Sequence, residues 1–306
     1  MRRIVGLVCL VLAGLLLVSA VLSGTWLSSS AKRTPVVLDT KTYLTGEAAA
    51  VPVGDPGPVQ YFSHTVTNPD KSDGDNVVFS TFTCLTKVTE EPAPDCVDAN
   101  DPDKRLVNAG TDNFVTDRRS ALALNADQTK KILGDDAEPH EGLVNKFPFN
   151  TEKKTYPFWD GVLQRSIDAN FEGVENLDGV EVYKFTTSAV DEPAEISEGI
   201  QGLYTTEGEM WVDPVTGSML KQAQHQVRKL DGQTMLDVNL VYTDDTIKAN
   251  VEDAKDNASR LGMLSALPWV LLPLGLILLV LGFFLIRSGR SQAAAPAGER
   301  TRTRRQ

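Results

Sequence analysis

The sequence predicts a mainly β (α+β) protein, in which an antiparallel, meander-type sheet domain with a few packing helices is flanked by a transmembrane helix at each end. Three observations predict this class. A long uncharged apolar run lies near each end of the 306-residue chain. Between these runs, apolar side chains recur at every second position, the period of a strand with one wet face. Asp-Gly pairs, which favour tight hairpins, separate the alternating stretches. We place the sheet domain, residues 23–263, outside the cytoplasm.

The first apolar run, residues 4–22, has the length of a membrane-spanning helix. It contains no charge, and at 1.5 Å per residue it spans roughly 28 Å, close to the thickness of the hydrocarbon core. We expect it to stay as an uncleaved anchor. The alternative is a signal peptide cleaved after the small residues of Val18-Ser19-Ala20.

The second run predicts a transmembrane helix over residues 264–286, with Pro268 suited to its first turn. Basic residues flank both spans on one side: Arg2 and Arg3 precede the first, and Arg287 and Arg290 follow the second. By the positive-inside rule, residues 1–3 and 287–306 lie in the cytoplasm. The last segment has too few apolar residues to fold, so we expect a disordered basic tail. This topology predicts a plasma-membrane protein, with the lipid bilayer as its partner.

The charge of the predicted outer domain excludes one class of partner. Residues 23–263 carry 22 basic and 40 acidic side chains. Binding to nucleic acid requires a basic face, so we expect no nucleic-acid partner.

Alternating patterns predict strands at 59–67, 76–88, 180–189, 209–212, 218–229 and 235–242. In the last of these, Leu236, Val238 and Leu240 alternate with Asp237 and Asn239. Three dipeptides predict the tight turns, and sequential strands are then neighbours: Asp73-Gly74, Asp178-Gly179 and Asp231-Gly232.

Helical spacing of apolar residues predicts a helix over 247–261 that packs on the sheet and leads into the second span. Two weaker patterns predict short helices at 125–134 and 157–164. Residues 46–58 and 90–104 are rich in Gly, Pro and Asp, so we expect loops there.

Cys84 and Cys96 are the only cysteines of the predicted outer domain. An extracytoplasmic compartment permits oxidation, so we expect them to form a disulfide. No C-x-x-C motif is present, so its role is expected to be structural.

The motifs do not predict a reaction. The chain has no H-E-x-x-H and no G-x-S-x-G. The acidic loop 95–103 offers oxygen ligands that suit Ca²⁺, but it lacks the glycine and the closing glutamate of a calcium loop, which favours a solvated acidic loop. We therefore expect no catalytic, cofactor-binding or metal-binding residues, and a protein that is not an enzyme.

Residues 146–161 form the most distinctive segment, with five aromatic side chains in 16 residues. These aromatics can anchor the domain core, or they can form a surface that binds a ligand or partner. We favour the core interpretation. The five side chains are Phe147, Phe149, Tyr156, Phe158 and Trp159.

The same segment, K-F-P-F-N-T-E-K-K-T-Y-P-F-W-D-G, resembles the signature of an actinobacterial family of two-span membrane proteins. Its members carry a domain of unknown function, and some are labelled PorA-family porins. Residues 209–217 resemble the late W-V-D-P-x-T-G turn of that family, and the resemblance covers nearly the whole chain. It implies an actinobacterial cell envelope, and it supplies no catalytic or binding residues.

Three functions from different classes remain open. The main hypothesis is a non-enzymatic, membrane-anchored envelope protein whose outer domain binds an envelope lipid or a membrane protein, or serves as a scaffold. The second is an oligomeric channel of the PorA family. The spans contain no polar stripe that could line water, and the strands carry charges on both faces, unlike a transmembrane barrel. The third is an enzyme acting on envelope polymers. The sequence does not determine the oligomeric state.

Overall fold

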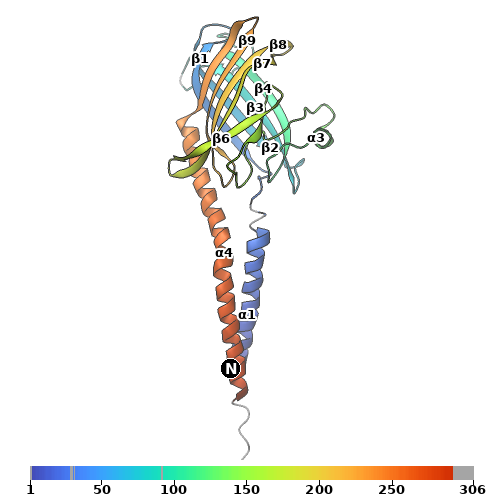
Figure 1. Cartoon of the computed structure of the whole chain (residues 1–306), viewed down its shortest axis with the longest axis vertical. Helices are drawn as coiled ribbons and strands as arrows, with labels where there is room; N and C mark the ends of the chain where they lie inside the picture. Colours follow the sequence, from blue (N-terminus) through green and yellow to red (C-terminus); the bar gives the residue numbers. More distant parts are fainter. Residues whose placement is uncertain (1, 28–29, 31, 91, 292–306) are drawn as a thin grey trace, which may run out of the picture. The chain divides into compact units, whose positions relative to one another are not determined.

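A computed structural model describes residues 2–27, 30, 32–90 and 92–291. The chain divides into two compact units, one formed by its two terminal regions and the other by residues 32–258. The helices and strands are shown in Figure 1.

The unit of residues 32–258 is built around one antiparallel sheet of ten strands, which confirms the predicted mainly β class. Figure 1 shows this sheet strongly curled. In sequence order the strands are β1 (Asp39–Ala50), β2 (Gly57–Thr67), β3 (Asn76–Lys87), β4 (Leu106–Asp117), β5 (Tyr156–Asp160), β6 (Arg165–Leu177), β7 (Val180–Ser197), β8 (Ile200–Val212), β9 (Met219–Leu230) and β10 (Gln233–Tyr242).

The strand order, β4-β3-β2-β1-β10-β9-β8-β7-β6-β5, joins two meanders. Within each meander, sequential strands are neighbours, as predicted. The meanders meet where the first strand pairs with the last, with Leu44 opposite Tyr242 and Ala48 opposite Val238. This central β1–β10 pairing was not predicted, because hairpin signals report only on strands that follow each other.

Two of the three predicted Asp-Gly turns have the expected geometry. Asp178 and Gly179 have φ of 49° and 88°, and Asp231 and Gly232 have φ of 49° and 80°. Positive φ at both central residues is what a type I′ hairpin requires. At Asp73 the connection is longer, and the carboxylate accepts the N–H groups of the residues two and three positions ahead (2.8 and 2.7 Å).

Two local predictions were wrong. Residues 156–160 form strand β5 and not the start of a helix over 157–164. Residues 46–50 belong to β1 and not to a loop. Gly46 contributed to the loop prediction, because glycine is typical of loops. In the structure this glycine lets the backbones of β1 and β10 approach closely: a Cβ at Gly46 would collide with the backbone of Asn239 on β10. Strands β1, β4, β5 and β6 were not predicted, and β7 and β8 are longer than their patterns indicated. Gly57 and Pro58, at the end of the predicted loop 46–58, are the first residues of β2.

The short helix predicted at 125–134 is present as α3 (Ala126–Leu133), capped by the Asn125 side chain, which accepts the Gln128 N–H (3.0 Å). The helix predicted at 247–261 is the first part of α4 (Asp244–Ser291). Val251 and Ala254 of α4 are buried against Val182, Trp211 and Leu220 on the sheet. The predicted packing of this helix is therefore confirmed.

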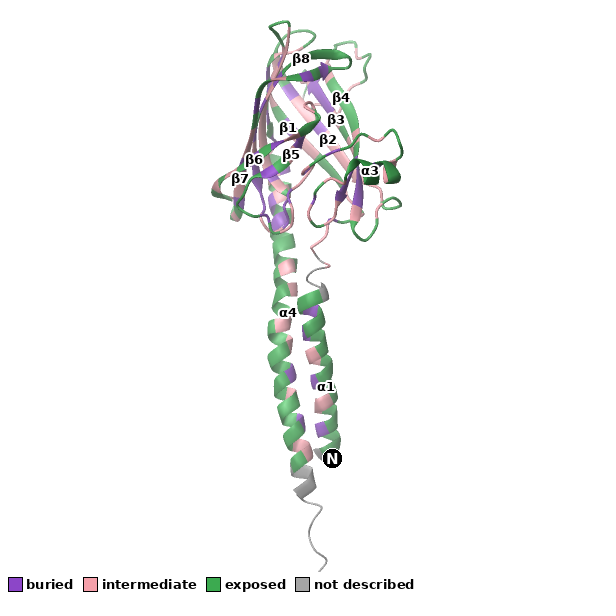
Figure 2. Cartoon of the chain, turned by 45° about the vertical axis from the view of Figure 1, so that its right-hand side comes forward, coloured by how far each residue is buried: buried purple, intermediate pink, exposed green. Residues whose placement is uncertain are grey.

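The second unit contains α1 (Arg2–Leu22), the π-helical turn η1 (Ser23–Leu27) and the rest of α4. Both helices are long and apolar enough to cross a membrane, and most of their residues are exposed (Figure 2). Residues 287–291 continue α4, so the predicted disordered tail does not begin at 287. Its remaining residues, 292–306, lie outside the described part of the chain.

The two helices pack through small residues. Gly6, Ala13 and Ala20 are the buried positions of α1, and they recur every seventh residue. Gly275 and Gly282 lie opposite them on α4, where a Cβ at Gly282 would lie 2.9 Å from the Gly6 carbonyl oxygen. Small residues at seven-residue spacing let helix backbones approach closely, as in packed transmembrane pairs. We call this contact the glycine-alanine seam.

Candidate binding cavity

The edge strands of the curled sheet are β4 and β5. The segment that connects them, residues 118–155, closes the sheet, and we call it the closing segment. Leu143 is the centre of this closure: its N–H donates to the Pro157 carbonyl (2.8 Å), and its carbonyl accepts the Trp159 N–H (2.7 Å). The side chain of Leu143 is fully buried. Three single bridges link β4 to β5: Thr116 with Ala123, Leu122 with Leu143, and Leu143 with Phe158.

A cavity of about 580 Å³ lies inside the closed sheet. Alternate residues of β1, β2, β3 and β10, and of most of β9, line it. Residues of β4 and β5, Tyr204 of β8 and residues of the closing segment add to the lining. This volume falls in the range of known small-molecule sites, about 300–1,000 Å³.

Strand β9 contributes a row of polar side chains to the cavity wall, which we call the polar strip. Its members alternate with residues that face the outside of the sheet, such as Lys221, whose ammonium lies 4.3 Å from the Trp211 ring centre. The polar strip consists of Gln222, Gln224, Gln226 and Arg228.

Strand β10 contributes a parallel row of apolar side chains, the apolar strip, formed by Leu236, Val238, Leu240 and Tyr242. All four residues are buried. Because β9 and β10 are paired, the two strips lie side by side across the ladder. The register places Leu236 opposite Arg228, Val238 opposite Gln226 and Leu240 opposite Gln224. The cavity therefore has an amphipathic wall.

Strands β1 to β3 add hydroxyl groups to the lining. The Thr65 and Thr81 hydroxyls are hydrogen-bonded to each other across the β2–β3 ladder (3.0 Å). Each hydroxyl both donates and accepts, so this wall can serve either kind of polar group on a ligand. The hydroxyl wall consists of Thr42, Ser63, Thr65, Thr81 and Thr83.

His140 also lines the cavity, and both of its ring nitrogens face oxygen acceptors. Nε2 lies 3.0 Å from the Asp112 carboxylate and Nδ1 lies 3.2 Å from the Glu138 carbonyl. The ring is packed between two aromatic side chains, with centroid distances of 5.5 Å to Phe114 and 4.7 Å to Trp159. These contacts hold the closing segment against β4.

Three polar side chains meet where the polar strip ends. The Asp160 carboxylate accepts the N–H groups of Val162 and Leu163 (both 2.9 Å) and lies 3.4 Å from the Tyr204 hydroxyl. Burial raises the pKa of Asp160 and of Tyr204, and the charge of Asp160 raises the pKa of Tyr204 further. Burial lowers the pKa of Arg228, which is opposite Tyr204 across the β8–β9 ladder.

Two lining residues carry buried polar atoms that have no hydrogen-bond partner among the described residues. They are Oδ1 of Asn145 and Nε of Arg228. Buried polar atoms in proteins are nearly always hydrogen-bonded. One acceptor, Oδ1 of Asn145, and one donor, Nε of Arg228, therefore remain available for hydrogen bonds with a bound molecule.

The aromatic segment divides between the core and the cavity. Phe147 and Tyr156 are buried in a cluster with Phe185. Phe158 and Trp159 line the cavity, although Trp159 is only 9% exposed. The remaining aromatic, Phe149, is half-buried under Lys146, whose ammonium lies 4.0 Å from the ring centre. The structure thus places part of this segment in the core and part of it in the cavity wall.

The two segments that carry the family resemblance contact each other. Phe147 N–H donates to the Gly217 carbonyl (2.8 Å), and Thr151 N–H donates to the Pro214 carbonyl (2.8 Å). Gly217 has a φ of 76°, and a Cβ at this position would collide with the Phe147 carbonyl. Beside this contact, burial lowers the pKa of Lys146 to about 8, while the negative charge of Asp213 acts in the opposite direction.

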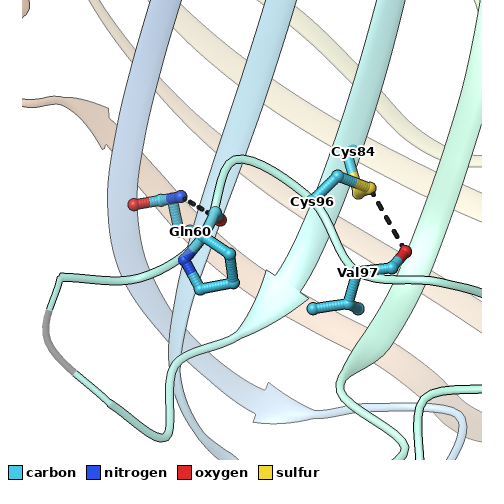
Figure 3. The surroundings of a disulfide bond; sticks show 5 residues. Gln60, Cys84, Cys96 and Val97 are labelled. Carbon is cyan, nitrogen blue, oxygen red and sulfur yellow. Dashed lines mark hydrogen bonds between the residues drawn. A yellow bond between two sulfur atoms is a disulfide. The ribbon is translucent and has the colours of Figure 1, made fainter.

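Cys84 and Cys96 form a disulfide, which fastens the loop 88–104 to the outer face of the sheet (Figure 3). Further bonds hold the same loop: the Gln60 side chain donates to the Pro94 carbonyl (3.0 Å), and the Tyr43 hydroxyl donates to Asp95 (3.1 Å). Asp101 is bound by Arg105, which lowers the pKa of Asp101 to about 2. The described residues contain no group of three or more metal-ligating side chains.

The outer face of the sheet carries ion pairs. Lys184 pairs with Glu209 (2.6 Å) and Lys229 pairs with Asp191 (2.8 Å). A barrel that faces lipid instead has an apolar outer band. The outer face is therefore suited to water.

The cavity was not predicted, because alternating strand patterns do not reveal whether the apolar faces of a sheet enclose a space or a solid core. One signal could have found it. In residues 222–228 glutamine or arginine occupies every second position, and the next predicted strand, 235–242, has apolar residues at every second position. A row of polar side chains on one face of a strand indicates that this face meets either water or a polar interior. The structure shows the polar interior.

Comparison with known proteins identifies related sequences. A family model described as Porin PorA matches residues 5–284. A protein named Porin PorA from Corynebacterium amycolatum is 32% identical over 118 residues, which cover 34% of this chain and 29% of that relative. Another protein of that name, from Corynebacterium resistens, is 23% identical over 279 residues, covering 60% of this chain and 67% of the relative. The chain thus matches less than a third of the length of the first relative.

Proposed function

Because the chain belongs to the PorA porin family, we propose that it is a membrane-anchored envelope protein whose sheet domain binds a small envelope component in its cavity, without catalysing a reaction. The observation that carries this proposal is the cavity of about 580 Å³ inside the closed sheet. A scaffold would not need an interior space, whereas a binding protein does.

The proposed arrangement places residues 1–3 and the tail in the cytoplasm and the sheet domain outside. Arg2 and Arg3 at the start of α1, and Arg287 and Arg290 at the end of α4, support this orientation. The disulfide supports it too, since an oxidising compartment preserves such bonds. A single cysteine introduced in an exposed loop of the sheet domain, in a chain lacking its native cysteines, should react with a membrane-impermeant maleimide in intact cells. A cysteine introduced in the tail should not, and its labelling would contradict the orientation.

The binding proposal is tested with the full chain purified from its native membrane. We expect mass spectrometry of the extracted small molecules to detect a component that is depleted in the variant Gln226→Trp, which fills the cavity. The matched control is Val227→Trp, the neighbouring residue on β9, which does not line the cavity. Thermal melts of both variants establish that the sheet is intact. Equal recovery of every component from wild type and both variants would contradict binding in the cavity.

Family membership favours a second candidate function, a channel. One copy offers no route through its helices, because the glycine-alanine seam brings α1 and α4 into direct contact. The charged outer face does not suit insertion of the sheet into lipid. A channel would therefore require several copies. The purified full chain should then give stepwise conductance in planar bilayers, and its absence at protein densities that conduct for a reference porin would reject this candidate.

A further inference from the structure

Arg228 is a cation that the sheet domain leaves without an ion pair. The arginine ion pairs in the described part of the chain are made by Arg105 and Arg165. Arg228 instead donates through Nη1 to the Ile196 carbonyl (2.9 Å), and its Nε is buried without an acceptor. A desolvated guanidinium has much to gain from an anion, because charge-assisted hydrogen bonds are about twice as strong as neutral ones.

The nearest candidate partner within the domain, Asp160, is occupied by other groups. One of its oxygens accepts two backbone N–H groups at 2.9 Å, and the other lies 3.4 Å from the Tyr204 hydroxyl. Asp160 acts on Arg228 only through space, and the arginine ion pairs of the described residues do not include one between these two side chains. The positive charge of Arg228 is therefore available to a ligand in the cavity that Arg228 lines.

The polar strip and the apolar strip indicate the chemistry of the rest of the ligand. Starting at Arg228, the polar strip offers the amides of Gln226 and Gln224 along β9. The apolar strip runs beside it, from Leu236 opposite Arg228 to Leu240 opposite Gln224. A molecule that extends from Arg228 along this wall therefore meets hydrogen-bonding groups on one side and aliphatic side chains on the other.

Building on the proposed binding function, we infer that the ligand is an amphipathic anion: a single carboxylate or phosphate group that binds Arg228, attached to an apolar body that lies along the apolar strip. Carboxylate and phosphate both offer two negatively charged oxygens that can accept parallel hydrogen bonds from one guanidinium group. The apolar strip packs in one cluster with Leu44 and Leu85, which also line the cavity. This side of the cavity disfavours a fully hydrophilic anion, because polar atoms beside aliphatic side chains lose hydrogen bonds to water.

The test measures binding of three water-soluble probes to the full chain in amphipol by calorimetry. Octanoate and octyl phosphate carry the two candidate anionic groups, and octyl glucoside is the neutral amphiphile. We expect the wild type to prefer one or both anions. In Arg228→Gln the affinity for the preferred anion should fall by roughly tenfold or more, the scale of a charge-assisted hydrogen bond, with little change for octyl glucoside.

The matched control is Lys229→Gln, which removes the adjacent positive charge. Lys229 does not line the cavity and pairs with Asp191, so this variant should bind all three probes like the wild type. The relative affinity of octanoate and octyl phosphate identifies which anionic group the site takes.

The outcomes separate this inference from the function on which it rests. If octyl glucoside binds as well as the anions, or if Arg228→Gln weakens all three probes equally, the inference is overturned while binding in the cavity stands. If the wild type binds none of the three, the inference is overturned, and the recovery of extracted components from wild type, Gln226→Trp and Val227→Trp decides separately whether binding in the cavity stands. Should Arg228→Gln fail to fold, Arg228→Lys takes its place: it keeps the charge but lacks the guanidinium fork, so its affinity for the preferred anion should fall while binding of octyl glucoside stays unchanged. Equal weakening of all three probes in this folded variant overturns the inference.

Discussion

Removal of the disulfide by the double substitution Cys84→Ala and Cys96→Ala should lower the stability of the sheet domain by an amount that follows from the structure. The two cysteines are 12 positions apart. In the chain-entropy model, cross-linking a loop of this size removes about 10 cal/mol/K of entropy from the unfolded chain, so the free energy of unfolding should fall by about 3 kcal/mol at 25 °C.

The folded state should change little, because other bonds hold the same loop. The Gln60 side chain binds the Pro94 carbonyl, and Asp95 is bound by Tyr43 and Lys41. The loss therefore appears in stability, chiefly through the unfolded chain. For a domain of about 150–250 residues, a loss of about 3 kcal/mol corresponds to a melting temperature lower by about 6–12 °C.

The assay is a thermal melt of the full chain in detergent, followed by intrinsic fluorescence, for the wild type and the double variant. Cys9→Ala is the control, since Cys9 is a free cysteine in α1 and not part of the sheet. Wild type treated with a reductant should melt like the double variant. A decrease in melting temperature smaller than about 2 °C would refute the reasoning. It would mean that removing the cross-link does not increase the conformational entropy of the unfolded chain.

Three further predictions concern the segments around the cavity. Trp159→Ala should destabilise the domain by roughly 3–5 kcal/mol, because the ring is 9% exposed, and an unchanged melt would instead make Trp159 chiefly a ligand contact. Gly217→Ala should lower the melting temperature more than Gly232→Ala: both glycines have positive φ, but only at Gly217 would a Cβ meet neighbouring atoms, so equal effects would contradict the packing argument. Lys146→Met tests the buried ammonium. The folded-state pKa is depressed from 10.5 to about 8, so protonated Lys146 costs stability below about pH 8 and this cost disappears as the pH rises to 10.5. Denaturant melts should show the stability of wild type rising relative to Lys146→Met across that window, and a constant difference would contradict the pKa.

The elements that sequence reasoning predicted correctly are those whose signals are local. Strand β10 has a clean alternation, α3 has a capping asparagine, and Asp178-Gly179 and Asp231-Gly232 determine their own turn geometry. In each case the residues that carry the signal are neighbours along the chain. Prediction failed where a distant partner decides the conformation. Gly46 is in a strand because the backbone of Asn239 lies against it, and β5 is a strand because it pairs with β6 and is bridged to Leu143.

The sequence contains a signal of the cavity but does not determine it, for a related reason. A polar row such as Gln222, Gln224 and Gln226 is compatible with a strand whose polar face meets water, and only the curl and closure of the sheet turn that face inward. The role of Arg228 depends further on what surrounds it: the absence of an ion pair can be recognised only when the neighbours of its guanidinium are known.

The pairing of the first strand with the last has a consequence for how the chain is made. Leu44 pairs with Tyr242, so the second partner of β1 emerges from the ribosome 198 residues after it. Until then the nascent domain consists of two separate meanders, and β1 exposes a free edge that can pair with other chains. Contacts this distant along the sequence also slow folding. A chain terminated before β10 would keep that edge permanently open, so an incomplete product differs from a finished one in a feature that chaperones and proteases can recognise.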